Sequence, residues 1–114
     1  MSKDHLILLK TAFEDPAQPG KAFFCPHGIP LEGLLAAFPE KGAQVEVSRL
    51  DFPRPRSPVI ALIGEENQSL PVLVLGDEYP VPQDAKTFGG RYFINDSKRI
   101  AAVLAERYGF PISH

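Results

Sequence analysis

Two short motifs constrain the fold of this chain most strongly: a cysteine ahead of an amphipathic segment, and a proline that opens an apolar run. Cys25 is the only cysteine and begins the tetrapeptide Cys-Pro-His-Gly. Apolar residues then recur at i, i+3, i+4 and i+7, at Leu31, Leu34, Leu35 and Phe38. This spacing predicts a helix that ends before Pro39. The helix starts near Gly28 or has a distorted first turn, because Pro30 is tolerated only in a first turn.

The remaining elements follow from short apolar runs and from capping signals. Strands are predicted, in chain order, over 6–9, 44–51, 72–75 and 90–94. The run at 72–75 directly follows Pro71 and is aliphatic throughout, which is typical of a strand buried on both faces. Two further helices are predicted over 57–63 and 97–108. Ser57 before Pro58 is a strong N-cap signal for the first, and Gly109 is a strong stop signal for the second.

The resulting order, β-α-β-α-β-β-α, predicts an α/β fold with a single four-stranded mixed sheet flanked by helices. Strands separated by helices pair in parallel through right-handed crossovers, and the last two strands form an antiparallel hairpin. Helices on both faces are the economical way to bury such a sheet. The connections over 11–22 and 77–87 are long and rich in proline, and we expect them to be loops that shape access to Cys25. Residues 1–114 are predicted to form one domain.

Composition argues against several classes of function. The net charge is −2 without a basic block, so nothing indicates binding to nucleic acid or to an anionic membrane. The apolar stretches are far shorter than the roughly 20 residues that span a bilayer. Early charged residues and the lack of a long apolar stretch near the start argue against a secretory signal. One cysteine excludes an internal disulfide, and we expect a cytoplasmic protein.

The element order and three local motifs resemble the thioredoxin-like superfamily, and more closely its branch of glutaredoxins and glutathione-transferase N-terminal domains. The tetrapeptide 25–28 stands where that branch places its redox motif. The segment 68–73 resembles the one whose proline is cis, and whose preceding residue, here Leu70, pairs its backbone with the cysteinyl part of glutathione. Asp96 and Ser97 resemble the acid–serine pair that holds the γ-glutamyl end of glutathione in transferases.

Three departures from that branch limit what the resemblance implies. Gly28 replaces the resolving cysteine, so dithiol exchange within one chain is impossible. The connection before Cys25 is longer than is usual in these families. The chain ends at His114 without an all-helical second domain, which disfavours a complete glutathione transferase. The stretch 52–56 additionally resembles a small bacterial family of uncharacterised thioredoxin-like proteins.

The chemistry open to the cysteine follows from its place ahead of a helix. A helix N-terminus carries unpaired N–H groups and about half a positive charge, which together favour a thiolate. His27 adds positive charge when it is protonated. The alternative is that Cys25 is a small buried apolar residue without a chemical role. No further cluster of cysteines and histidines completes a metal site.

The other candidate residues would bind substrate. We expect the Leu70–Pro71 bond to be cis, with its backbone facing Cys25 across a groove, where Leu70 can pair with an extended peptide. The alternative is an ordinary trans proline at the start of a strand. Asp96 and Ser97 are helix caps, ligand-binding residues, or both. Candidates for pairing with a glutathione carboxylate, if they are not merely solvated, are Lys21, Arg54 and Arg56.

Three functions remain open on the sequence. The first is a monothiol glutaredoxin-like oxidoreductase or glutathione-binding protein, in which Cys25 attacks a mixed disulfide and glutathione resolves it. Its partners would be glutathione or a protein thiol or disulfide. The second is a non-catalytic thioredoxin-fold binding or assembly module. The third is a glutathione-transferase-like domain that works with a partner chain.

Overall fold

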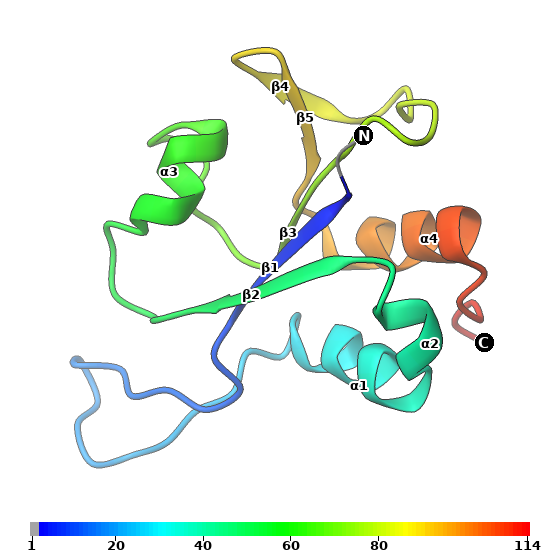
Figure 1. The fold of residues 1–114 in the computed structure, drawn as a ribbon. Helices are drawn as coiled ribbons and strands as arrows, with labels where there is room; N and C mark the ends of the chain where they lie inside the picture. The colour runs from blue at the N-terminus through cyan, green and yellow to red at the C-terminus, as the bar shows by residue number, and fades with distance from the viewer. Residues whose placement is uncertain (1–2) are drawn as a thin grey trace.

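A mixed five-stranded β-sheet forms the centre of the structure, a computed structural model that describes residues 3–114 (Figure 1). The strands are β1 (His5–Leu9), β2 (Glu46–Leu50), β3 (Val72–Val74), β4 (Lys86–Phe88) and β5 (Arg91–Ile94). The helices are α1 (Ile29–Ala37), α2 (Pro39–Gly42), α3 (Ser57–Ile63) and α4 (Ser97–Tyr108). The α/β class and the single mixed sheet flanked by helices are confirmed.

The strand order across the sheet is β2-β1-β3-β5-β4. β1 pairs in parallel with β2, while β3 runs antiparallel to β1 and to β5. β4 and β5 form a hairpin at one edge. The hairpin predicted between the strands at 72–75 and 90–94 is not formed, because β4 lies between them in the chain and forms the hairpin with β5. β3 and β5 are also antiparallel neighbours, as expected for the last two predicted strands.

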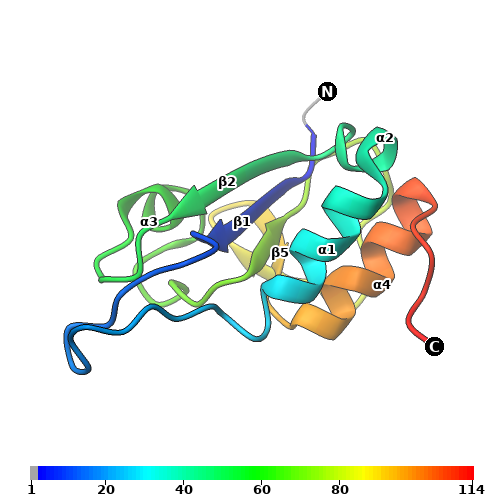
Figure 2. The same ribbon diagram turned by 90° about the horizontal axis from the view of Figure 1, so that it is seen from below.

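Helices cover both faces of the sheet, with α1 and α4 on one side and α3 on the other (Figure 2). The alternation of side chains along the strands produces these two cores. Leu6 and Leu8 of β1 join the core under α1 and α4, whereas Ile7 between them joins the core under α3. β3 is buried along its whole length, which confirms the prediction made from its unbroken aliphatic run.

The prediction of four strands is wrong, because the segment predicted as a loop over 77–87 contains most of β4. All three residues of Lys86–Phe88 are exposed. β4 lies at the edge of the sheet and buries no side chain, so its sequence carries no apolar alternation from which a strand could be predicted.

Two helix boundaries also differ from the prediction. Pro39 ends α1 as expected, yet it begins the short helix α2 as well, since proline is tolerated in a first turn. Ser57 is the first residue of α3 and not its N-cap, which is Arg56. No side chain caps α3. Asp96 does cap α4, and Gly109 ends it in the left-handed conformation, as predicted.

A buried ion pair ties the start of β1 to the end of α4. The Asp4 carboxylate accepts hydrogen bonds from Arg107 Nη1 at 2.7 and 2.9 Å and from the Tyr108 hydroxyl at 2.6 Å. It also accepts from the backbone N–H of Gly76 at 2.6 Å. Burial raises the pKa of Tyr108, and its bond to Asp4 raises it further. The cluster therefore joins three distant parts of the chain.

Candidate functional site

A cavity of about 400 Å³ lies where α1, β3 and α4 begin. Its lining residues come from three stretches of chain: His27, then Ser69, Leu70 and Pro71, then Asn95, Asp96 and Ser97. Five of these seven were predicted as site residues from the sequence. The topology brings them together because the strand that follows Pro71 and the strand that precedes Asn95 are antiparallel neighbours.

The Leu70–Pro71 peptide bond is cis, as predicted. A second cis bond, Arg54–Pro55, was not predicted. Pro71 is buried and Leu70 is half-buried, and both lie at the wall of the cavity. A cavity therefore lies beside this segment, and His27 of the cysteine motif lines it with Leu70 and Pro71. The predicted position of Cys25 across this groove is not supported, because Cys25 is not among the lining residues.

Cys25 is half-buried and is not among the residues that line the cavity. Its backbone carbonyl accepts the N–H groups of Gly28 and Ile29 at 3.1 and 3.0 Å, so the cysteine begins the turn that leads into α1. A Cβ atom placed on Gly28 would lie 3.6 Å from Cys25 Cβ and 3.8 Å from its Sγ. The side chain of any residue at position 28 would thus lie beside the thiol.

The variant Gly28→Cys tests this geometry directly. Disulfides join Cβ atoms that are about 3.5–4.5 Å apart, and the backbone at Gly28, with φ −88°, accepts a side chain without strain. We expect this variant to form an intramolecular disulfide under mild oxidation, seen as a loss of both free thiols in a thiol titration. The matched control Gly33→Cys, in α1, should keep both thiols in the monomer. If the Gly28→Cys monomer also keeps them, the described geometry of the motif is wrong.

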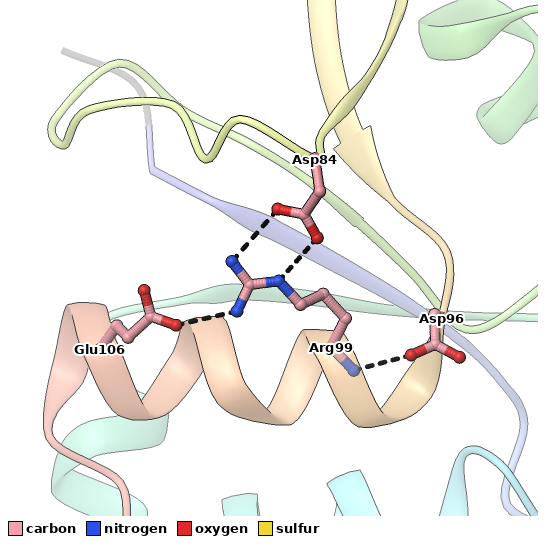
Figure 3. A network of polar contacts seen from close by, with 4 residues as sticks. All are labelled: Asp84, Asp96, Arg99 and Glu106. Atoms are coloured by element: carbon pink, nitrogen blue, oxygen red, sulfur yellow. Dashed lines mark hydrogen bonds and ion pairs between the residues drawn. The ribbon is translucent and has the colours of Figure 1, made fainter.

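Asp96 serves as the N-cap of α4. One carboxylate oxygen, Oδ2, accepts the backbone N–H of Arg99 at 2.9 Å, and the second oxygen points away from that amide (Figure 3). Asp96 is exposed and Ser97 is half-buried, and both remain at the cavity wall. The capping role is therefore confirmed, and it leaves the pair in a position to meet a ligand.

The predicted carboxylate-binding cations do not lie in the cavity. Lys21 and Arg54 are exposed, and neither belongs to the lining. Arg56 is only 7% exposed, and its guanidinium donates to the carbonyl oxygens of Phe52 and Gln68. The prediction that Arg56 pairs with a ligand carboxylate in this cavity is therefore not supported, because Arg56 is absent from the lining and its guanidinium is bonded to backbone carbonyl oxygens.

Arg56 nevertheless lies within electrostatic range of the thiol. Burial lowers the pKa of the Arg56 guanidinium, and the positive charge of Arg54 lowers it further, whereas a charged Cys25 raises it. His27 is exposed and is the basic side chain within the cysteine motif itself.

The two long connections differ in their relation to the site. Residues 11–22 lead directly to the cysteine motif, and Phe13 pairs with Phe23 and stacks on Phe52 at a centroid distance of 4.8 Å. Residues 77–87 follow β3 at the opposite end of the sheet, beside the start of β1 (Figure 1). The prediction that 77–87 shapes access to Cys25 is not supported.

Two contacts hold the 77–87 segment against α4. Arg99 makes paired bonds with Asp84 at 2.7 and 3.1 Å and one bond with Glu106 at 2.9 Å (Figure 3). Arg107 donates to the carbonyl oxygen of Pro80. The bonds to Asp84 and Glu106 raise the pKa of Arg99, and the bond to Arg99 lowers the pKa of Asp84. Residues 77–87 are therefore anchored on α4.

Some residues of the site were not singled out from the sequence. Ser69 and Asn95 line the cavity, and both are neighbours of residues that were predicted. Within residues 3–114, no group of three or more His, Cys, Asp or Glu side chains is placed to hold a metal ion. In the same part of the chain, no helix has the length and apolar character needed to cross a membrane.

A family model described as "Protein of unknown function (DUF3088)" matches residues 3–112. No curated protein and no solved structure matches the chain.

Proposed function

We propose that this chain, which belongs to the DUF3088 family, is a thioredoxin-like protein that binds glutathione and uses Cys25 for thiol–disulfide exchange. The observation that carries the proposal is the composition of the cavity. It collects His27, Leu70 with Pro71, and Asp96 with Ser97 from three separated stretches of chain. The resemblance to glutaredoxins and transferase N-terminal domains assigns these same stretches to the redox motif, the backbone-pairing segment and the acid–serine pair.

The ligand contacts in this proposal follow from the chemistry of each wall. Asp96 accepts from the α-amino group of glutathione, and Ser97 donates its hydroxyl to the γ-glutamyl carboxylate. The N-terminus of α4 adds a favourable dipole for that carboxylate. Leu70 pairs through its backbone with the cysteinyl part, which directs the ligand's sulfur toward the motif that contains His27.

The proposed reaction has two exchange steps. The Cys25 thiolate attacks the glutathionyl sulfur of a protein–glutathione mixed disulfide, forms a Cys25–glutathione disulfide and releases the protein thiolate. A second glutathione thiolate attacks the glutathionyl sulfur of that disulfide, which yields oxidised glutathione and returns Cys25 as the thiolate. No second protein cysteine is needed, which agrees with glycine at position 28. We assign this activity to a reducing compartment, the cytoplasm.

One observation favours a second candidate, a non-catalytic binding module. Cys25 is half-buried and lies outside the lining of the cavity, so the cavity can bind a ligand without the thiol. In that case the walls made by Leu70 and Asp96 would bind a peptide or an amino-acid-like ligand. Cys25 would then be a structural residue that packs against its neighbours and takes no part in chemistry.

Calorimetry with reduced glutathione on the wild type and on Asp96→Ala tests the proposal. Because a charge-assisted hydrogen bond is worth about 1.5–3 kcal/mol, Asp96→Ala should weaken binding by roughly tenfold or more. Cys25→Ser should keep the affinity, yet it should lose the reduction of a glutathionylated peptide, because the alcohol stays protonated at neutral pH.

The control separates ligand binding from helix capping. Asp96→Asn keeps an equally good cap for α4 but removes the negative charge. If Asp96→Asn binds as tightly as the wild type, Asp96 acts only as a cap. Absence of binding to the wild type at millimolar glutathione would rule out the proposed function and leave the binding module.

A further inference from the structure

We propose that Arg56 and Gln68 form a buried clamp that fixes the backbone of the cavity wall Ser69–Leu70–Pro71, and that this clamp sets the affinity of the cavity for its ligand. The part concerning affinity rests on the proposed function. Neither residue lines the cavity. Both are positioning residues, because they act on a ligand only through the wall.

Arg56 supplies four bonds of the clamp. Its guanidinium donates from Nη1 to the carbonyl oxygen of Gln68 at 2.8 Å, and from Nη2 and Nε to the carbonyl oxygen of Phe52 at 2.6 and 3.2 Å. Its backbone N–H donates to the Gln68 side chain at 2.7 Å. The guanidinium also lies over the Phe52 ring, 5.7 Å from the centroid. Arg56 thus bridges the loop before α3 and the segment after it.

Gln68 completes the clamp with both ends of its amide. Oε1 accepts the backbone N–H of Arg56, while Nε2 donates to the carbonyl oxygen of Glu65 at 2.9 Å. Gln68 is only 7% exposed. Its backbone carbonyl, its side-chain oxygen and its side-chain nitrogen are therefore all bonded, which fixes the residue immediately before the wall.

The placement of these bonds indicates a role beyond general stability. The wall has no helix of its own, since α3 ends at Ile63 and β3 begins at Val72. The clamp therefore anchors the chain at Gln68, just before the wall, and β3 anchors it at Val72, just after the wall. A polar cluster that is both buried and fully bonded defines one conformation of the segment that it joins.

Hydrogen–deuterium exchange tests the clamp without any ligand. In Gln68→Ala the amides of 66–70 should exchange about tenfold faster or more, because the two side-chain hydrogen bonds of Gln68 are lost. The amides of β1 should exchange as in the wild type. The matched variant Tyr108→Phe loses a buried hydrogen bond at the other end of the sheet and should leave exchange at 66–70 unchanged. Unchanged exchange at 66–70 in Gln68→Ala overturns the clamp.

Calorimetry with reduced glutathione, at a temperature where every variant is folded, tests the effect on affinity. Gln68→Ala should bind about tenfold more weakly, whereas Tyr108→Phe should bind as the wild type does. Gln68→Glu keeps the acceptor for the Arg56 N–H and should recover most of the affinity. Arg56→Lys keeps the positive charge but loses the planar guanidinium with its several N–H donors. Its affinity for glutathione should therefore fall by about as much as that of Gln68→Ala.

The two experiments separate this inference from the proposed function. Accelerated exchange in Gln68→Ala together with a wild type that does not bind glutathione rejects the proposed function and supports the clamp. Wild-type affinity in Gln68→Ala, despite accelerated exchange, overturns the claim that the clamp sets affinity.

Discussion

Replacement of Asp4 with alanine should lower the free energy of unfolding by about 3–5 kcal/mol, the range for loss of one partner from a buried ion pair. Asp4 is 2% exposed and Arg107 is 9% exposed, so water cannot solvate the guanidinium that is left behind. The variant also removes the acceptor for the Tyr108 hydroxyl and for the Gly76 N–H. Urea denaturation followed by far-ultraviolet circular dichroism measures the effect.

An exposed ion pair provides the matched control. Lys10 and Asp51 are 2.7 Å apart, with side chains that are 57% and 75% exposed. Asp51→Ala should therefore change the free energy of unfolding by no more than about 1 kcal/mol. Equal effects of Asp4→Ala and Asp51→Ala would show that the Asp4 cluster does not hold β1 to α4.

Gly64→Ala should lower the free energy of unfolding by about 1–3 kcal/mol, because its backbone has φ +90° and ψ 161°, a region that only glycine adopts readily. The added Cβ would also lie 2.6 Å from Cζ of Phe88, so the Phe88 ring would have to move away from the end of α3. Urea denaturation measures the loss, and the chemical shifts of Phe88 report the displacement.

Gly33→Ala is the opposite case in the same protein. Gly33 lies within α1, and nothing lies within 4 Å of an added Cβ. Alanine should raise the free energy of unfolding by about 0.5–1 kcal/mol, since glycine costs a helix that much. If both variants shift stability in the same direction, the backbone of Gly64 does not have the conformation described.

Much of the fold follows from the sequence because the buried elements have periodic apolar residues. The helix after Cys25, the strand after Pro71 and the last helix all occupy their predicted positions to within about two residues. Helix start and stop signals were also predicted correctly where a single residue forms the cap. The Asp96 cap and the Gly109 stop need only the neighbouring turn of their own helix.

Sequence reasoning also predicted five of the seven residues that line the cavity, as expectations drawn from a resemblance to another family. His27, Leu70, Pro71, Asp96 and Ser97 were predicted from separate motifs, and the fold brings all five to one cavity. It did not predict that Cys25 would lie outside the lining of that cavity. Lining depends on the direction of each side chain in the folded protein, which the chain order does not specify.

The tertiary structure alone determined the features that depend on partners far apart in the chain. Arg56 could be a surface cation from its sequence context, and only its bonds to Phe52 and Gln68 show that it is a buried anchor. Asp4 and Arg107 are likewise ordinary charged residues until β1 and α4 meet. β4 has no apolar pattern, because an exposed edge strand is held by backbone pairing and not by a buried face. Sequence therefore determined the elements that bury apolar side chains of their own. The tertiary structure decided which polar groups pair, since a charged side chain has no preferred partner until the fold removes the water around it.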